Sequence, residues 1–161
     1  MAICSWISIP ATVPFTLQTF GVFVAVGLLG GKRGTLSVLV YILLGAVGLP
    51  VFAGFSGGLG SLFGSAGGYI IGFLGSALVM WAMEKLLGAG AVAQIASMVV
   101  GLLVCYAFGT AWFMAVYTNA NGAVTLLTVL GWCVFPFIVP DLLKIVLAFV
   151  LTNRLKRYVP Q

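Results

Sequence analysis

The chain has 161 residues, of which 63% are hydrophobic and only 6% charged, and its formal net charge is +5. A soluble domain covers itself with charged side chains, so this composition excludes an ordinary soluble fold and is typical of an integral membrane protein. We expect one domain over residues 1–161 that contacts the lipid bilayer over most of its surface. The basic residues lie at segment ends, which is typical of topology signals and argues against a nucleic-acid-binding face.

Glycine, proline and the few charges divide the chain into apolar segments that predict an all-α bundle of six transmembrane helices. The first run, MAICSWISI, stops at Pro10, and because ten helical residues rise only about 15 Å it is too short to cross a membrane. The connections include a glycine-rich stretch at 51–68 and a polar turn at 118–122, followed by a short apolar run at 124–135. The other five helices are expected at 16–31, 35–50, 69–85, 91–117 and, marked by prolines, within 135–158.

The basic residues predict the orientation of this bundle. Along an alternating six-helix path the six basic residues other than Lys144 fall on one side, and the positive-inside rule makes that side cytoplasmic, together with both termini. The loop at 10–16, the glycine-rich stretch and the connection after 118 then face outward. The residues concerned are Lys32 and Arg33 between two helices, Lys85 between two others, and Arg154, Lys156 and Arg157 after the last one.

Asp141 and Lys144 are an acid and a base inside an otherwise apolar helix. Their spacing of three places both on one helical face. A structural ion pair is one interpretation, but burying charges near lipid is costly, so a pair there more often contacts a ligand. Pro140 suits the first turn of a helix, whose partial positive charge would favour an ionised Asp141. Together the two groups suit a small ligand with both donor and acceptor edges.

The glycine-rich stretch VFAGFSGGLGSLFGSAGG meets this pair at the same outer end of the bundle. Glycine permits positive φ and close backbone approach, so a segment such as the one around Gly54 can offer backbone polar groups to a ligand. A flexible linker is the alternative, although the interleaved apolar side chains favour a lid or pocket wall. With Gln18 beyond the first loop, these features predict an outward-facing pocket.

Catalytic signatures are weak in this sequence. Gly54-Phe55-Ser56-Gly57 fits a serine-protease pattern, but the chain has no histidine to take the proton of Ser56. The three cysteines lack CxxC spacing and read as small core residues, so we expect no metal and no cofactor. No GxxxxGK[ST] motif is present, so any ATP hydrolysis would belong to a partner. An enzyme is therefore not expected.

Small residues at four-residue spacing, at Gly27 and Gly31 and at Gly68, Gly72 and Ser76, predict close helix packing. Internal packing is favoured over a partner face. Trp112 lies near the outer end of its helix, where it suits a pocket wall and an interfacial aromatic belt equally well.

Four segments of the chain together resemble the BioY family, the biotin-specific S components of energy-coupling factor (ECF) transporters. These segments are IPATVPFTLQTF, the long block containing GLPVFAGFSGG and GSAGGYIIGF, GTAW, and FPFIVPDLLK. The resemblance implies a six-helix protein of the S-component type in the cytoplasmic membrane of a prokaryote. It also implies high-affinity biotin binding at the outer face, and docking onto a transmembrane T component with two ATP-binding-cassette ATPase subunits.

The resemblance also implies roles for individual residues. Asp141 would accept hydrogen bonds from the ureido N–H groups of biotin, and Lys144 would donate to an acceptor oxygen. Gln18 would add a polar contact, and Gly54 would contact the ligand from the glycine-rich stretch. The pocket walls would be Phe52, Tyr69 and Trp112.

Two departures from the family pattern stand out. The family's longer first helix contacts the T component through alanines at four-residue spacing, whereas this chain has only Ala2 before Pro10. The family's GPTGG pattern is replaced by Gly-Ser-Ala-Gly-Gly at 64–68. Two alternatives to a biotin transporter subunit stay open: an S component for another vitamin, and a membrane scaffold protein in which the charged pair is purely structural.

Overall fold

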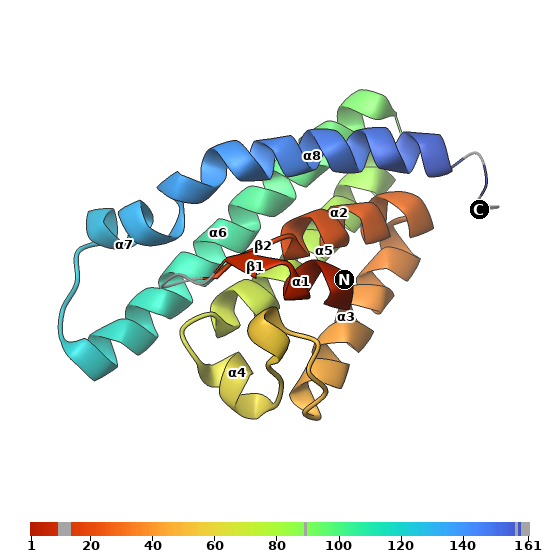
Figure 1. Cartoon of the computed structure of the whole chain (residues 1–161). Helices are drawn as coiled ribbons and strands as arrows, with labels where there is room; N and C mark the ends of the chain where they lie inside the picture. Colours follow the sequence, from red (N-terminus) through yellow and green to blue (C-terminus); the bar gives the residue numbers. More distant parts are fainter. Residues whose placement is uncertain (10–13, 89, 157, 159–161) are drawn as a thin grey trace.

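The computed structural model describes residues 1–9, 14–88, 90–156 and 158, and most of these residues are helical (Figure 1). Pro10, predicted to end the first helix, and Arg157, one of the predicted topology signals, lie outside the described residues. The described helices are α1 (Ala2–Trp6), α2 (Gln18–Leu29), α3 (Gly31–Ala46), α4 (Leu59–Phe63), α5 (Gly67–Leu87), α6 (Ala91–Asn121), α7 (Leu126–Cys133) and α8 (Phe135–Leu155). A 3-10 turn, η1 (Ala53–Phe55), precedes α4, and β1 (Ser8–Ile9) pairs antiparallel with β2 (Phe15–Thr16).

The centre of the bundle is the antiparallel pair α5 and α6, which glycine allows to approach closely. A Cβ added at Gly68 would lie 2.2 Å from Cβ of Trp112, and one at Gly109 would lie 2.2 Å from the Tyr69 ring. At Gly72 the neighbour is the backbone of Cys105. The small residues therefore serve internal packing, as the sequence predicts.

The remaining long helices pack around this pair. Helix α8 crosses the bundle along α2, and α3 packs against both α2 and α5 (Figure 1). Short α7 connects α6 to α8. Apolar side chains from α2, α3, α5, α6 and α8, including Phe23, Val38, Phe73, Phe113 and Ile145, form one buried core.

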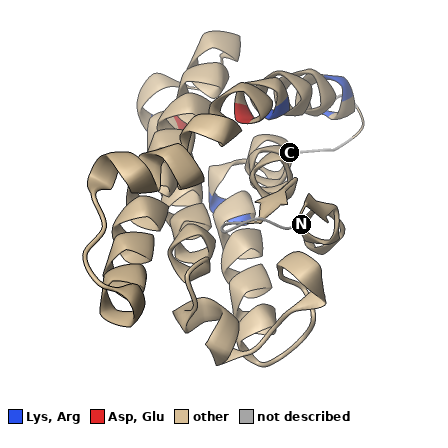
Figure 2. Cartoon of the chain, turned by 60° about the vertical axis from the view of Figure 1, so that its left-hand side comes forward, with Lys and Arg blue, Asp and Glu red and all other residues tan. Residues whose placement is uncertain are grey.

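The outer surface of the helices is apolar, and the few charged stretches stand out in Figure 2. Among the described helices, α5, α6 and α8 are long and apolar enough to cross a membrane. Helix α3 is shorter, yet it exposes one apolar face made of Leu36, Leu39, Val40 and Leu43. The chain is thus a mostly helical protein with the surface of a membrane protein.

Two predicted connections are wrong because the helices continue through them. Lys32 and Arg33 were expected between helices, but they lie in the first turn of α3, since Gly30 with φ of 80° makes the turn alone. Residues 118–121 were expected as a polar turn, but they form the last turn of α6. That helix ends only at Gly122, whose φ is 91°. A polar sequence without a glycine or proline does not stop a helix that packing has already formed.

Two further expectations fail nearer the charged pair. Pro140 does not begin the last helix: α8 starts at Phe135, Pro136 occupies its first turn, and Pro140 lies inside it. The chain is also not purely helical, because Ser8–Ile9, predicted in the first helix, pairs as a strand with Phe15–Thr16, which lies at the end of the predicted first loop. The first helix accordingly stops at Trp6, earlier than the sequence predicts.

Replacing Gly68 by alanine should destabilise the bundle, because the new methyl group would overlap the Trp112 side chain. We expect a loss of about 1–3 kcal/mol in the free energy of unfolding, measured by thermal or denaturant unfolding in detergent. Gly131→Ala is the matched control, since its Cβ would meet no atom within 4 Å. In the middle of α7 that change should be neutral or stabilising by up to about 1 kcal/mol. Equal effects of the two changes would contradict the packing described above.

Candidate functional site

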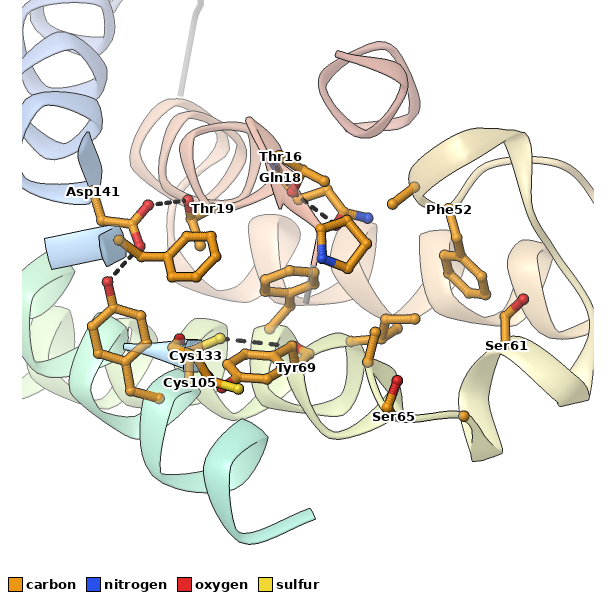
Figure 3. A pocket seen from close by; sticks show the side chains of 18 of the residues that line it. Thr16, Gln18, Thr19, Phe52, Ser61, Ser65, Tyr69, Cys105, Cys133 and Asp141 are labelled. Atoms are coloured by element: carbon orange, nitrogen blue, oxygen red, sulfur yellow. Dashed lines mark hydrogen bonds between the residues drawn. The ribbon is translucent and has the colours of Figure 1, made fainter. Parts of the chain in front are cut away.

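A cavity of about 260 Å³ lies among α2, α5, α6 and α8 and is closed on one side by the glycine-rich segment. Figure 3 shows Asp141 and Thr19 toward one end of this cavity and Phe52, Ser61 and Ser65 toward the other. The first end is charged, whereas the second combines serine hydroxyls with apolar walls. The cavity therefore offers different chemistry to the two ends of an elongated ligand.

The carboxylate of Asp141 is held by donors from three helices. The side chain of Asp141 is only 4% exposed. Its Oδ1 accepts from Lys144 Nζ at 2.7 Å and from Thr19 Oγ1 at 3.1 Å, and its Oδ2 accepts from the Tyr106 hydroxyl at 2.5 Å. A buried carboxylate needs such partners, because an unpaired charge in an apolar interior is very costly.

The ammonium of Lys144 ties α8 to the start of α2. Besides Asp141, Lys144 Nζ donates to the backbone oxygen of Thr16 in β2 at 2.7 Å. It also lies 4.2 Å from the ring centroid of Phe15, which stacks on Phe137 at 5.7 Å. The strand pair is therefore anchored to the charged end of the cavity by a hydrogen bond and a cation–π contact.

Counting donors and acceptors indicates what this pair can still bind. An ammonium has three N–H donors, and Thr16 and Asp141 take two of them; a carboxylate has about four acceptor positions, and three are used. One donor position on Lys144 and one acceptor position on Asp141 Oδ2 thus remain. They match a ligand that presents an N–H group next to a carbonyl oxygen.

The opposite wall is fixed by a chain of contacts from α2 to the glycine-rich segment. Gln18 Nε2 donates to the Tyr41 hydroxyl at 2.7 Å, and that hydroxyl donates to the backbone oxygen of Val51 at 2.8 Å. Next to Val51, Phe52 packs edge-on against Tyr41 and over Gly45, where any Cβ would overlap its ring. The segment is therefore a built wall of the cavity and not a free linker.

The structure brings together five of the seven residues that the sequence predicts for the site. Around the cavity lie Gln18, Phe52, Tyr69, Asp141 and Lys144. The other two predicted residues, Trp112 and Gly54, are not among the described residues that line the cavity. Trp112 packs behind the wall, where it covers Gly68 and its indole N–H donates to the backbone oxygen of Gly64 at 3.0 Å. Gly54 has φ of 65°, and a Cβ there would meet no atom within 4 Å.

Sequence reasoning missed the two neutral donors to Asp141. Thr19 lies directly after Gln18, and Tyr106 lies in the middle of α6, where the sequence singles out only Trp112. A usable signal existed for Tyr106, because a tyrosine deep in an apolar helix needs a partner for its hydroxyl. Among the described residues, no group of three or more possible metal ligands occurs.

The comparisons with known proteins all point to the same family. The sequence profile of the BioY family matches residues 1–161. The "Probable biotin transporter BioY" of Pyrococcus horikoshii is 44% identical over 144 residues, which cover 89% of this chain and 81% of that protein. The "Biotin transporter BioY" of Thermotoga maritima is 42% identical over 154 residues, covering 95% and 87%.

A solved structure shares the fold. It is the crystal structure of the S-component for biotin from an ECF-type ABC transporter, with a TM-score of 0.85 and 31% sequence identity. The alignment covers 97% of this chain and 84% of that one.

Replacing Tyr106 by phenylalanine should destabilise the protein, because Asp141 Oδ2 would lose its donor while remaining buried. We expect a loss of about 1–3 kcal/mol in the free energy of unfolding, read as a lower melting temperature in detergent. Tyr117→Phe is the control, since its hydroxyl makes no hydrogen bond among the described residues. A melting temperature unchanged by Tyr106→Phe would show that Asp141 does not depend on this phenol.

Proposed function

The chain belongs to the BioY family, and we propose that it takes up biotin as the membrane-embedded, substrate-binding subunit of an ECF-type transporter. The observation that carries this proposal is the buried Asp141–Lys144 pair at one end of a cavity with apolar walls. Biotin has complementary chemistry, with a ureido ring that presents N–H groups beside a carbonyl oxygen. Its remaining ring is apolar, and its valerate chain ends in a carboxylate.

In this proposal the charged pair recognises the ureido ring. The acceptor position left on Asp141 receives one ureido N–H, and the third donor of Lys144 binds the ureido oxygen. The apolar ring and chain then extend along Phe52 and Tyr69, with Gln18 adding a polar contact near the first loop. The cavity volume of about 260 Å³ lies just below the range of about 300–1,000 Å³ that is typical of pockets for drug-sized molecules. It therefore suits a ligand as small as a vitamin.

The transport cycle requires partners. The chain contains no nucleotide-binding motif, so we propose that a T component and two ATP-binding-cassette subunits supply the energy. We place the protein in the cytoplasmic membrane with its C-terminus in the cytoplasm and the cavity toward the outer face; α1, with five residues, is too short to be a sixth span. The support is the side on which the basic residues fall. Residues 1–161 form one substrate-binding domain that needs no cofactor.

Removing either charge should abolish tight binding of biotin. We expect Asp141→Asn and Lys144→Met each to weaken binding at least about 30-fold, because the partner charge is left buried and unpaired. Calorimetry and biotin-induced thermal stabilisation of the purified chain measure this. Lys85→Met, at an exposed position, is the control and should bind normally.

The melting temperature of the unliganded protein separates loss of binding from loss of fold. The double variant Asp141→Asn with Lys144→Met leaves no lone buried charge, so it should fold and still fail to bind. Normal biotin binding by a folded double variant would refute the assigned site.

Analogues test which part of biotin meets the charged pair. Methylation of a ureido nitrogen removes a donor, and we expect it to weaken binding at least about tenfold, because Asp141 then faces a group that cannot donate. Desthiobiotin retains the ureido group and should lose less. Competition against labelled biotin measures both, and a methylated analogue that competes as well as biotin would exclude this orientation.

A further inference from the structure

A second feature with recognition chemistry lies at the end of the bundle away from the cavity. Here α3 begins beside the end of α5, on the side opposite α4 (Figure 1). Lys85, near this end of α5, is sixteen residues from Tyr69 in the cavity wall, which corresponds to about 24 Å along the helix. A shallow groove between the two helix ends is lined by Leu29, Gly30, Gly31, Lys32, Arg33, Trp81, Glu84 and Lys85.

The floor of this groove is a built contact. The backbone N–H of Gly31 donates to Glu84 Oε2, which turns the only acid of the groove toward the start of α3. A Cβ at Gly31 would lie 2.4 Å from Trp81 Cδ1 and 2.7 Å from its Cα. Glycine at position 31 therefore lets the two helix ends meet, and this contact sets the spacing of the side chains around the groove.

Three cations surround this floor without an acidic partner of their own. Lys85 Nζ lies 4.5 Å from the ring centroid of Trp81, while Lys32 and Arg33 are exposed in the first turn of α3. Among the described residues the one salt bridge joins Lys144 to Asp141, so none of these three is paired with a carboxylate. Because three cations stand against the single carboxylate of Glu84, the groove presents a net positive charge to its surroundings.

The rim of the groove is apolar. Leu29 lines it, Leu36 is exposed one turn further along α3, and Leu86 is 82% exposed beside Lys85. Tryptophan commonly lies at the boundary between headgroups and hydrocarbon, and basic pockets between transmembrane helices bind anionic headgroups. Cations next to Trp81, with leucines directly below, match a phosphate joined to acyl chains better than they match a soluble anion.

We propose that this groove is a binding site for an anionic phospholipid, whose phosphate contacts Arg33 and Lys85 while its acyl chains lie on the exposed leucines of α3. The site is separate from the cavity and does not depend on biotin.

The test compares two lipids on the delipidated full chain in neutral detergent at low ionic strength. Phosphatidylglycerol and phosphatidylcholine with the same acyl chains are titrated, and native mass spectrometry and thermal unfolding report binding. We expect phosphatidylglycerol to bind about 30-fold more tightly, since Arg33 and Lys85 each contribute about 1 kcal/mol, or roughly fivefold, near an anionic lipid. Equal binding of the two lipids would overturn the proposal.

Matched double variants locate the effect. Arg33→Gln with Lys85→Gln should reduce the preference for phosphatidylglycerol to about twofold or less. Arg154→Gln with Lys156→Gln removes the same charge from the end of α8 and should preserve the preference. An equal loss in both variants would mean a general effect of net charge and would overturn the site.

Two controls complete the test. Inorganic phosphate should not displace phosphatidylglycerol, and displacement would identify a soluble-anion site instead of a lipid site. The single variant Arg33→Gln leaves Lys85 over Trp81 and should lose part of the preference, whereas full retention would exclude Arg33. The melting temperature of each lipid-free variant reports its fold without using biotin.

Discussion

The structure depends on the pairing of Asp141 with Lys144 inside an apolar bundle. Neither charge is left alone there without a large cost, because breaking a buried ion pair typically costs about 3–5 kcal/mol, a large share of the stability of a typical fold. The solution draws on segments distant in sequence: Thr19 from α2, Tyr106 from α6 and the Thr16 backbone from β2. The same contacts that satisfy the charges therefore join the helices that enclose the cavity, so that the site and the fold stabilise each other.

Much of the fold could be predicted because bilayer thickness sets the length of an apolar helix and glycines mark where many of the helices end. The predicted helix at 69–85 corresponds to Gly67–Leu87, and the one at 16–31 to Gln18–Leu29. The failures were local. Pro140 was taken as a helix start although Pro136 already fills that place, and the polar residues at 118–121 stayed helical. Lys144 donates to the Thr16 backbone in β2, a contact between distant segments that no local pattern reveals.

The charged part of the candidate site could be predicted because charged residues are scarce in this chain. Asp141 and Lys144 stand out in any apolar chain, and Gln18, Phe52 and Tyr69 followed from the resemblance and do line the cavity. Trp112 was misplaced because the sequence cannot tell which face of α6 meets Gly68. Thr19 and Tyr106 were missed because their types are ordinary, and only three-dimensional geometry shows that both donate to one carboxylate.

The unequal helix lengths have a consequence for the surrounding membrane. Sixteen residues give α3 a length of about 24 Å, whereas the thirty-one residues of α6 extend about 46 Å, and a bilayer core is about 30 Å thick. Lipids beside the exposed face of α3 must compress, while α6 must tilt or protrude. A change in membrane thickness would therefore be felt differently at α3 and at α6. Tyr41 of α3 holds the cavity wall, so a shift of α3 in response would reach the cavity.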